Sequence, residues 1–327
     1  MQYRTLDNGH TSFDVSTLCL GTMFMGTRTD EETSFAILDR FVEAGGTFLD
    51  TANNYNAWVG GYGRDSEDVL GRWLAARGNR DHLRLATKLG AAKQDPDLPL
   101  STTPPTNYQG LGASTIDREA RESLRHLGTD HIDVLYGHVD DRETPLEETV
   151  AAFGKLVDEG LVGIPGISNV ALWRVVEARE TAARLGVAPY GAVQQCYSYV
   201  YPRPQPIRTN WATPELLDYA RSTGTPGRPG LSVMAYSPLH QGAFTRDDKP
   251  LYDGSDHAGS WARIKTLRAL AVEIGATPNQ VALAWLLGGE VPVVPVLGAS
   301  TVAQLDEALD AMDLVLDDEI RQRLDNA

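Results

Sequence analysis

Four side chains of complementary chemistry follow three successive apolar runs of the chain. They are a carboxylate, a phenol, an ammonium and an imidazole, at Asp50, Tyr55, Lys88 and His138. The preceding apolar runs span residues 47–49, 83–87 and 132–136. If these runs are neighbouring strands of a parallel barrel, the four side chains meet on the face where barrel enzymes form their active sites. Four unrelated strand caps are the alternative, but the grouping at three consecutive strand ends favours a proton-transfer site.

The proton chemistry of such a cluster follows from its charges. A tyrosine phenol has an ordinary pKa of about 10, and a neighbouring ammonium lowers it. We therefore expect Lys88 to lower the pKa of Tyr55 toward working pH, while Asp50 keeps Lys88 protonated and in position. His138 is expected to donate a hydrogen bond to a substrate oxygen. These roles suit protonation of a carbonyl oxygen while hydride reaches the carbon. None of the four side chains can donate hydride, so a cofactor is required.

Two other barrel chemistries fit the residues less well. The seven histidines show neither HxH nor HExxH spacing, and no metal site is predicted. A retaining glycosidase needs two carboxylates at strand ends, which Asp50 with Asp140 or Asp141 could supply. That alternative stays open on the carboxylates alone, although it gives Tyr55 and Lys88 no role.

The elements that must position these residues alternate along the chain, a pattern typical of βαβ units and a parallel sheet. Strands are predicted at residues 18–20, 47–49, 83–87, 132–136, 163–167, 192–196, 232–235 and 293–296. Eight main helices are predicted at 31–43, 67–74, 114–127, 147–159, 172–185, 214–222, 265–274 and 302–309, and a capping signal stands at 277–278. We therefore expect a (β/α)8 TIM barrel that forms one domain over residues 1–327.

Three segments depart from this alternation. Residues 1–14 predict an N-terminal hairpin with its turn at Asp7–Gly9, which could plug the bottom of the barrel. Residues 91–112 and 239–260 are rich in turn-forming residues and follow the third and seventh strands. Both are expected to be long loops on the C-terminal face, where such loops shape binding pockets.

Composition narrows the function further. The net charge of −15 and the pI near 4.9 argue against a nucleic-acid or anionic-membrane partner. No apolar stretch approaches the roughly 20 residues of a membrane span, and the N-terminus lacks the apolar segment of a secretion signal. The two cysteines, Cys19 and Cys196, lie in apolar runs and offer no disulfide framework. A cytoplasmic protein of unknown oligomeric state is the simplest expectation.

Signals for a dinucleotide are spread over the later strand ends. No GxGxxG follows a strand, which counts against a Rossmann unit. Amide side chains at Asn169 and Gln194 could pair with the carboxamide of a nicotinamide, and Tyr236 could stack on the nicotinamide ring. Backbone N–H groups able to bind phosphate are expected at Ser237, Gly242 and residues 298–300. Taken singly, each of these is more often a turn or cap residue.

Longer motifs stand in a fixed order along the chain. They include LGTM (20–23), FLDTANNY (48–55), SEDVLGRWL (66–74), ATKLG (86–90), SLRHLGTDHIDVLYGH (123–138), GISN (166–169), AVQQCYS (192–198), AYSPLHQG (235–242) and PVLGAS (295–300). With these motifs the chain resembles the aldo-keto reductase family over essentially its whole length. The resemblance implies an NADPH-dependent reductase of aldehydes or ketones, with a small-molecule carbonyl as its substrate. The alternative is a cofactor-binding sensor or regulatory subunit with little turnover.

The resemblance also implies roles for individual residues. The catalytic tetrad is Asp50, Tyr55, Lys88 and His138, with Tyr55 as the general acid. The expected cofactor contacts are Gly21, Thr22, Met23, Asp50, Ser168, Asn169, Gln194, Tyr236, Ser237, Leu239, Gly242, Gly298, Ser300, Gln304 and Glu307. The substrate pocket is expected to include Met23, Tyr55 and His138. Trp58, in an insertion (56–64) that departs from the family pattern, is an expected aromatic wall of the same pocket.

One departure from the family pattern concerns the choice of dinucleotide. Members that use NADPH usually place Lys or Arg after the eighth strand to bind the 2′-phosphate. Residues 298–305 read GASTVAQL, without a basic residue. Neutral donors at Ser300, Thr301 and Gln304 are weaker than charged ones. We therefore expect NADPH to be used with only a modest preference, and NADH to be possible.

Overall fold

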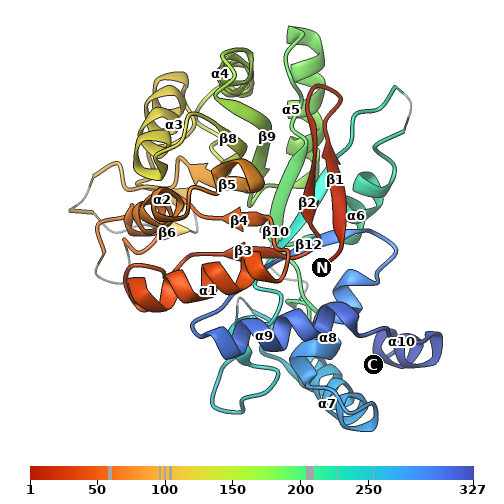
Figure 1. Ribbon diagram of the computed structural model, residues 1–327. Helices are drawn as coiled ribbons and strands as arrows, with labels where there is room; N and C mark the ends of the chain where they lie inside the picture. Colours follow the sequence, from red (N-terminus) through yellow and green to blue (C-terminus); the bar gives the residue numbers. More distant parts are fainter. Residues whose placement is uncertain are drawn as a thin grey trace.

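Eight parallel strands close into a barrel, in the order β3-β4-β5-β8-β9-β10-β11-β12, with β12 pairing back to β3. The computed structural model describes residues 1–57, 61–95, 97–98, 101–102, 105–203, 210–225, 227–252 and 254–327 (Figure 1). The barrel strands are β3 (Cys19–Gly21), β4 (Phe48–Asp50), β5 (Arg84–Leu89), β8 (Ile132–Gly137), β9 (Val162–Ser168), β10 (Ala192–Cys196), β11 (Ser232–Tyr236) and β12 (Val293–Gly298). The predicted (β/α)8 TIM barrel is confirmed.

Helices surround the strands (Figure 1). They are α1 (Glu31–Glu43), α2 (Asp65–Arg77), α3 (Ala113–Leu127), α4 (Leu146–Asp158), α5 (Leu172–Leu185), α6 (Pro214–Arg221), α7 (Ala258–Glu273), α8 (Pro278–Leu287), α9 (Val302–Asp310) and α10 (Asp318–Asp325). Short 3₁₀ turns are η1 (Arg80–His82), η2 (His240–Gly242) and η3 (Ala311–Asp313). No helix among the described residues is both long and apolar enough to cross a bilayer.

The helix prediction needs two corrections. Ten α-helices occur in the described part of the chain, rather than eight, because α8 follows α7 without an intervening strand and α10 follows α9. In addition, α7 begins at Ala258, inside the segment expected to be a loop. The imidazole of His257 caps this helix by accepting from the Ser260 N–H. A polar, glycine-containing first turn conceals such a start in the sequence.

The N-terminal hairpin closes the end of the barrel where the strands begin. Its strands, β1 (Tyr3–Asp7) and β2 (Ser12–Ser16), pair antiparallel, as predicted. Leu6 and Val15 are fully buried in the same apolar cluster as Phe48 and Val134 of the barrel. A second small hairpin, β6 (Ser101–Thr102) with β7 (Pro105–Thr106), lies within the expected loop after β5.

Side-chain alternation along the strands decides which residues reach the barrel interior. On β4, Phe48 belongs to the interior cluster, whereas Leu49 belongs to the layer between strands and helices. The same alternation places Ala86 of β5 and Tyr136 of β8 in the interior. Because successive strand residues point to opposite faces, the residues two positions further along each strand also point inward. Those positions are Asp50, Lys88 and His138.

Candidate active site

Three of the four expected catalytic residues stand at the C-terminal ends of neighbouring strands. Asp50 is the last residue of β4, Lys88 lies within β5, and His138 is the first residue after β8. The strands run one or two residues further than predicted, because the parallel pairing of β5 with β8 continues to Leu89 and Gly137. Tyr55 lies five residues beyond β4, so a loop rather than a strand positions it.

Lys88 connects this group. Its Nζ donates hydrogen bonds to Asp50 Oδ2 at 2.5 Å, to the Tyr55 hydroxyl at 2.8 Å and to the Thr51 carbonyl at 2.6 Å. The ammonium is fully buried and has three protons, so these three acceptors use its whole donor capacity. The arrangement fixes the Tyr55 hydroxyl at hydrogen-bond distance from a buried positive charge.

The charges of the group differ from the expectation in one respect. Burial alone would lower the pKa of Lys88, but attraction to Asp50 and Tyr55 raises it above the ordinary value, so Lys88 stays an ammonium. Burial raises the pKa of Tyr55 and outweighs the lowering by Lys88. The expected net fall in the pKa of Tyr55 is therefore wrong for this structure. The phenol keeps its proton at neutral pH, which is the state a proton donor needs.

His138 completes the group as a neutral donor. Its ring meets the Tyr55 ring edge-on, with the centroids 6.0 Å apart and an angle of 74° between the planes. Burial and the charge of Lys88 lower the pKa of His138 to about 3, so the imidazole is uncharged near pH 7. Its Nδ1 is buried and has no hydrogen-bond partner among the described residues. A buried N–H without an acceptor is costly, so the favoured tautomer carries its proton on Nε2.

Asp140 and Asp141, the carboxylates that a retaining glycosidase would use with Asp50, have other partners. Asp140 forms ion pairs with Arg142 at 2.7 Å and Arg174 at 2.9 Å. Asp141 accepts from the Leu111 N–H at 2.7 Å and from the Thr144 hydroxyl at 2.6 Å. Both therefore brace the loops around β8, and the geometry favours the tetrad over a carboxylate pair.

Residues expected at the nicotinamide are connected directly to the tetrad. Gln194 Nε2 donates to Asp50 Oδ1 at 2.8 Å. Asn169 Nδ2 donates to the His138 carbonyl at 3.0 Å, and Asn169 Oδ1 accepts from the Tyr236 hydroxyl at 2.9 Å. The Ser168 hydroxyl donates to the Gln194 carbonyl at 2.7 Å. The structure thus brings these residues beside the catalytic group, while their contacts to a cofactor stay predictions.

The loop after β11 has an unusual backbone. Ser237, His240 and Gln241 adopt positive φ angles of 54°, 46° and 56°, and Gly242 follows with 89°. Left-handed residues are uncommon outside glycine, and consecutive ones can turn backbone N–H groups toward an anion. Leu239 precedes η2 in the same loop. Within the loop, the N–H groups of His240 and Gly242 donate to the carbonyls of Ser237 and Leu239, and the expected phosphate contacts stay predictions.

The residues expected at the adenine end include no cation, and two of their side chains already have partners. Gln304 Oε1 accepts from the Ser300 N–H at 2.8 Å, and Glu307 Oε1 accepts from the Thr277 hydroxyl at 2.6 Å. Gly298 is exposed at the end of β12. Of the two arginines on nearby loops, Arg246 is ion-paired with Asp248, and Arg28 lies over the Phe24 ring, 4.6 Å from its centroid.

The segment after β3 braces the strand that carries Asp50. Gly21 pairs with Asp50 across the two strands, and the N–H and hydroxyl of Thr22 both contact the Asp50 carbonyl, at 2.9 and 3.1 Å. Met23 follows and is half-buried. Trp58, expected in the substrate pocket, lies outside the described residues.

Some groups that hold the site together were not predicted from the sequence. The Thr51 carbonyl accepts from Lys88, and the Ser66 hydroxyl bonds those of Thr22 and Thr51 at 2.7 and 2.8 Å. Backbone carbonyls and small hydroxyls carry no distinctive pattern. Ser66 stands just before the run EDVLGRWL and predicts the N-cap of a helix there, but α2 begins at Asp65 and Ser66 lies inside it.

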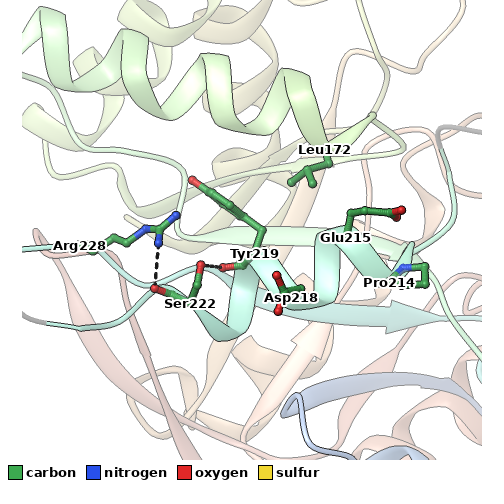
Figure 2. Close-up of a pocket in the computed structure, with 7 residues that line it drawn as sticks. All are labelled: Leu172, Pro214, Glu215, Asp218, Tyr219, Ser222 and Arg228. Atoms are coloured by element: carbon green, nitrogen blue, oxygen red, sulfur yellow. Dashed lines mark hydrogen bonds between the residues drawn. The ribbon is translucent and has the colours of Figure 1, made fainter.

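A pocket on the outer surface lies apart from the tetrad. It has a volume of about 580 Å³ and is lined by Leu172, Pro214, Glu215, Asp218, Tyr219, Ser222 and Arg228 (Figure 2). Figure 2 shows the Arg228 side chain reaching the Ser222 carbonyl, at 3.3 Å. None of the tetrad or of the expected cofactor residues lines it.

Comparison with known proteins agrees with the geometry. Residues 17–327 match the model of the Aldo/keto reductase family. The chain is 35% identical to the uncharacterized oxidoreductase YrpG of Bacillus subtilis, over 100% of this chain and 95% of the relative. It is 33% identical to norsolorinic acid reductase stcV of Emericella nidulans, over 93% and 76% of the two chains. It is 28% identical to the aryl-alcohol dehydrogenase GME11368 of Pestalotiopsis microspora, over 96% and 79%.

Proposed function

The chain belongs to the aldo/keto reductase family, and on that premise we propose that it reduces an aldehyde or ketone to an alcohol with NADPH, with Tyr55 as the proton donor. Membership supports an NAD(P)H-dependent oxidoreductase that acts on small-molecule carbonyl compounds. The single observation that carries the finer proposal is the buried Lys88 ammonium, which contacts both the Tyr55 hydroxyl and Asp50.

Each member of the tetrad has one task in this proposal. Tyr55 gives its proton to the carbonyl oxygen, and Lys88 stabilises the phenolate that remains. Asp50 keeps Lys88 charged and fixes its Nζ. His138, neutral and protonated on Nε2, donates a hydrogen bond to the same carbonyl oxygen and orients it. A reduced nicotinamide supplies the hydride to the carbonyl carbon when it is bound.

The residues present fit a dinucleotide. The amide nitrogen of Gln194 contacts Asp50, and the proposal gives its amide oxygen to the nicotinamide carboxamide. Ser168 and Asn169 are the other expected nicotinamide contacts, and Tyr236 is the expected stacking ring. The pyrophosphate is assigned to the left-handed loop that begins at Ser237. The remaining cofactor contacts proposed are Gly21, Thr22, Met23, Leu239, Gly242, Gly298, Ser300, Gln304 and Glu307.

The cofactor preference and the substrate class depend on residues outside the tetrad. NADPH is favoured by the family, but the neutral groups after β12 support only a modest preference over NADH. Relatives are named for norsolorinic acid and for an aryl alcohol, and we therefore place aromatic aldehydes and ketones first among candidate substrates. A cytoplasmic location also stays part of the proposal.

A turnover panel tests the proposal against a sensor that binds cofactor without reacting. The purified protein is mixed with NADPH or NADH and with aromatic aldehydes, aromatic ketones, aliphatic aldehydes or sugars, while absorbance of the reduced cofactor is followed. The proposal predicts catalytic oxidation of cofactor with at least one carbonyl class. Tight cofactor binding without turnover on any compound would support the sensor instead.

A further inference from the structure

The proton donor sits in an asparagine-rich segment whose side chains all reach away from it. Tyr55 is flanked by Asn53 and Asn54 before it and by Asn56 after it. All three asparagines are buried, with 3%, 7% and 0% of their surfaces exposed. Burial of an amide is costly unless its groups are bonded. Asn56 is bonded through both side-chain atoms, whereas Asn53 and Asn54 are bonded through Nδ2 and have no partner for Oδ1 among the described residues.

Asn56 connects the segment to the loop after β3. Its Nδ2 donates to the Met25 carbonyl at 3.0 Å, and its Oδ1 accepts from the Thr27 hydroxyl at 2.7 Å. Its backbone is left-handed, with φ of 75°. Asparagine tolerates this conformation better than most residues with a Cβ, so one residue supplies both the turn and the two bonds.

The other two asparagines reach different elements. Asn54 Nδ2 donates to the Ala91 carbonyl, just after β5, at 3.2 Å. Asn53 Nδ2 donates to Glu119 Oε2 on α3 at 2.8 Å, and Arg64 bonds the same oxygen at 2.6 Å. The backbone N–H of Asn53 also donates to the Lys88 carbonyl at 3.0 Å. The segment is thus held from three directions, one of them the strand that carries Lys88.

We propose that Asn53, Asn54 and Asn56 are positioning residues that hold the Tyr55 hydroxyl at Lys88. The need for them follows from the fold, because Tyr55 is the one tetrad residue carried by a loop well beyond its strand. A displacement of the reacting group by about 1 Å can lower a rate by roughly 10²-fold. The kinetic part of this inference rests on the proposed function, whereas the placement of Tyr55 does not.

Asn56→Gly tests the inference most cleanly, because glycine keeps the left-handed backbone and removes both side-chain bonds. We expect kcat to fall about 10–100-fold, with an unchanged Kd for the cofactor. Asn56→Ala, which also strains the backbone, should lower kcat further. The matched control is Asn8→Ala, at the opposite end of the barrel. Asn8 is equally buried, and it bonds the Pro189 carbonyl and the N–H groups of His10 and Thr11. The Asn8→Ala substitution should lower Tm and leave kcat unchanged.

A readout independent of activity separates this inference from the proposed function. Alkaline absorbance titration of each protein, minus that of its Tyr55→Phe counterpart, reports the pKa of Tyr55 alone. Burial holds this pKa above its ordinary value in the native segment. In Asn56→Gly it should move toward the ordinary value of about 10, as the phenol gains access to solvent. If the native protein shows no turnover, the proposed function fails but this titration still tests the placement.

Three results would overturn the inference. The first two are an unchanged Tyr55 titration in Asn56→Gly, and a kcat of that variant equal to that of the native protein below the Tm of both. A third, an equal loss of kcat in Asn8→Ala, would also overturn it, because it would assign the effect to general stability. If Asn56→Gly does not fold, Thr27→Val removes one of its bonds from a half-buried neighbour. That variant should shift kcat and the titration in the same directions by smaller amounts, and native values for both would contradict the inference.

Discussion

The two sides of the site are held together by different interactions. On the side of β4, β5 and β8, buried charges contact one another directly, with Lys88 Nζ 2.5 Å from Asp50 and 2.8 Å from Tyr55. On the side of β11 and β12, left-handed backbone and neutral side chains such as Gln304 take the place of charges. Under the proposed function, we expect the first side to determine the rate of proton transfer and the second to determine which dinucleotide binds and how tightly. Substitutions on the two sides should therefore affect different constants.

The largest effect is expected from Tyr55→Phe. Removing the phenol hydroxyl removes the proton donor, so kcat should fall by about 10²–10⁴, the usual contribution of a positioned acid. The Kd of the cofactor should hardly change, because the hydroxyl contacts Lys88 rather than the cofactor side. Steady-state kinetics and cofactor titration of the same preparation measure both. Near-normal turnover by the variant would show that Tyr55 is not the acid.

Loss of either partner in the buried ion pair should lower kcat by about 10–10³ and shift the pH profile in opposite directions. Reduction needs protonated Tyr55, so the rate persists below the pKa of Tyr55 and is lost above it. The charge of Lys88 lowers that pKa and the charge of Asp50 raises it. The alkaline fall should therefore move to higher pH in Lys88→Met and to lower pH in Asp50→Asn.

The double variant sharpens this expectation. Because Asp50 holds Lys88 Nζ in place, removing Asp50 also removes part of what Lys88 contributes, so the two losses in kcat at neutral pH should not add. Kinetics of the native protein, both single variants and the double variant form the required cycle. A double loss equal to the sum of the single losses, in kcal/mol, would contradict the coupling.

A smaller effect is expected on the cofactor side. The native protein should prefer NADPH over NADH by no more than about 1–2 kcal/mol, because no cation stands among residues 298–305. Gln304→Arg should tighten NADPH about tenfold relative to Gln304→Ala and leave NADH unchanged. The alanine variant is the control because both changes remove the bond to the Ser300 N–H. A native preference of a thousandfold or more, from measured Kd values, would require a cation elsewhere.

The smallest effect concerns His138, for which we expect no titration in the working range. Its pKa is lowered to about 3, so kcat should be level between about pH 5 and 8. His138→Gln keeps a neutral N–H donor and should retain more activity than His138→Phe. An inflection of the native profile near pH 6.5 that disappears in His138→Gln would contradict a neutral imidazole.

The strand pattern predicted the barrel and the positions of Asp50, Lys88 and His138 at its strand ends, for a physical reason. Strand alternation and pairing register are regular, so residues such as Asp50 and Lys88 can be assigned to the interior from their distance along an apolar run. The boundaries were less accurate, because polar residues at the strand ends hid the last paired positions of β4 and β5. The start of α7 was missed since its first turn is composed of residues typical of loops.

The electrostatics and the loop contacts could not be predicted in this way. The pKa of Tyr55 depends on a balance between burial and the charge of Lys88, and the sequence gives the sign of each influence but not their relative size. The contacts of the asparagines around Tyr55 could not be predicted, because their partners, such as Glu119 and Met25, are distant in the sequence. Contacts between loops carry no periodic pattern.

The central claim, that the charged side of the site performs carbonyl reduction, is tested most directly by one turnover with labelled cofactor. The protein, in excess, is mixed with NADPH carrying deuterium at the transferred position and with the best aromatic aldehyde of the panel. The products are then analysed by mass spectrometry and NMR. Our account predicts one equivalent of alcohol for each cofactor oxidised, with deuterium on the carbinol carbon. Bound cofactor that stays reduced, with no labelled alcohol formed from any carbonyl of the panel, would contradict it.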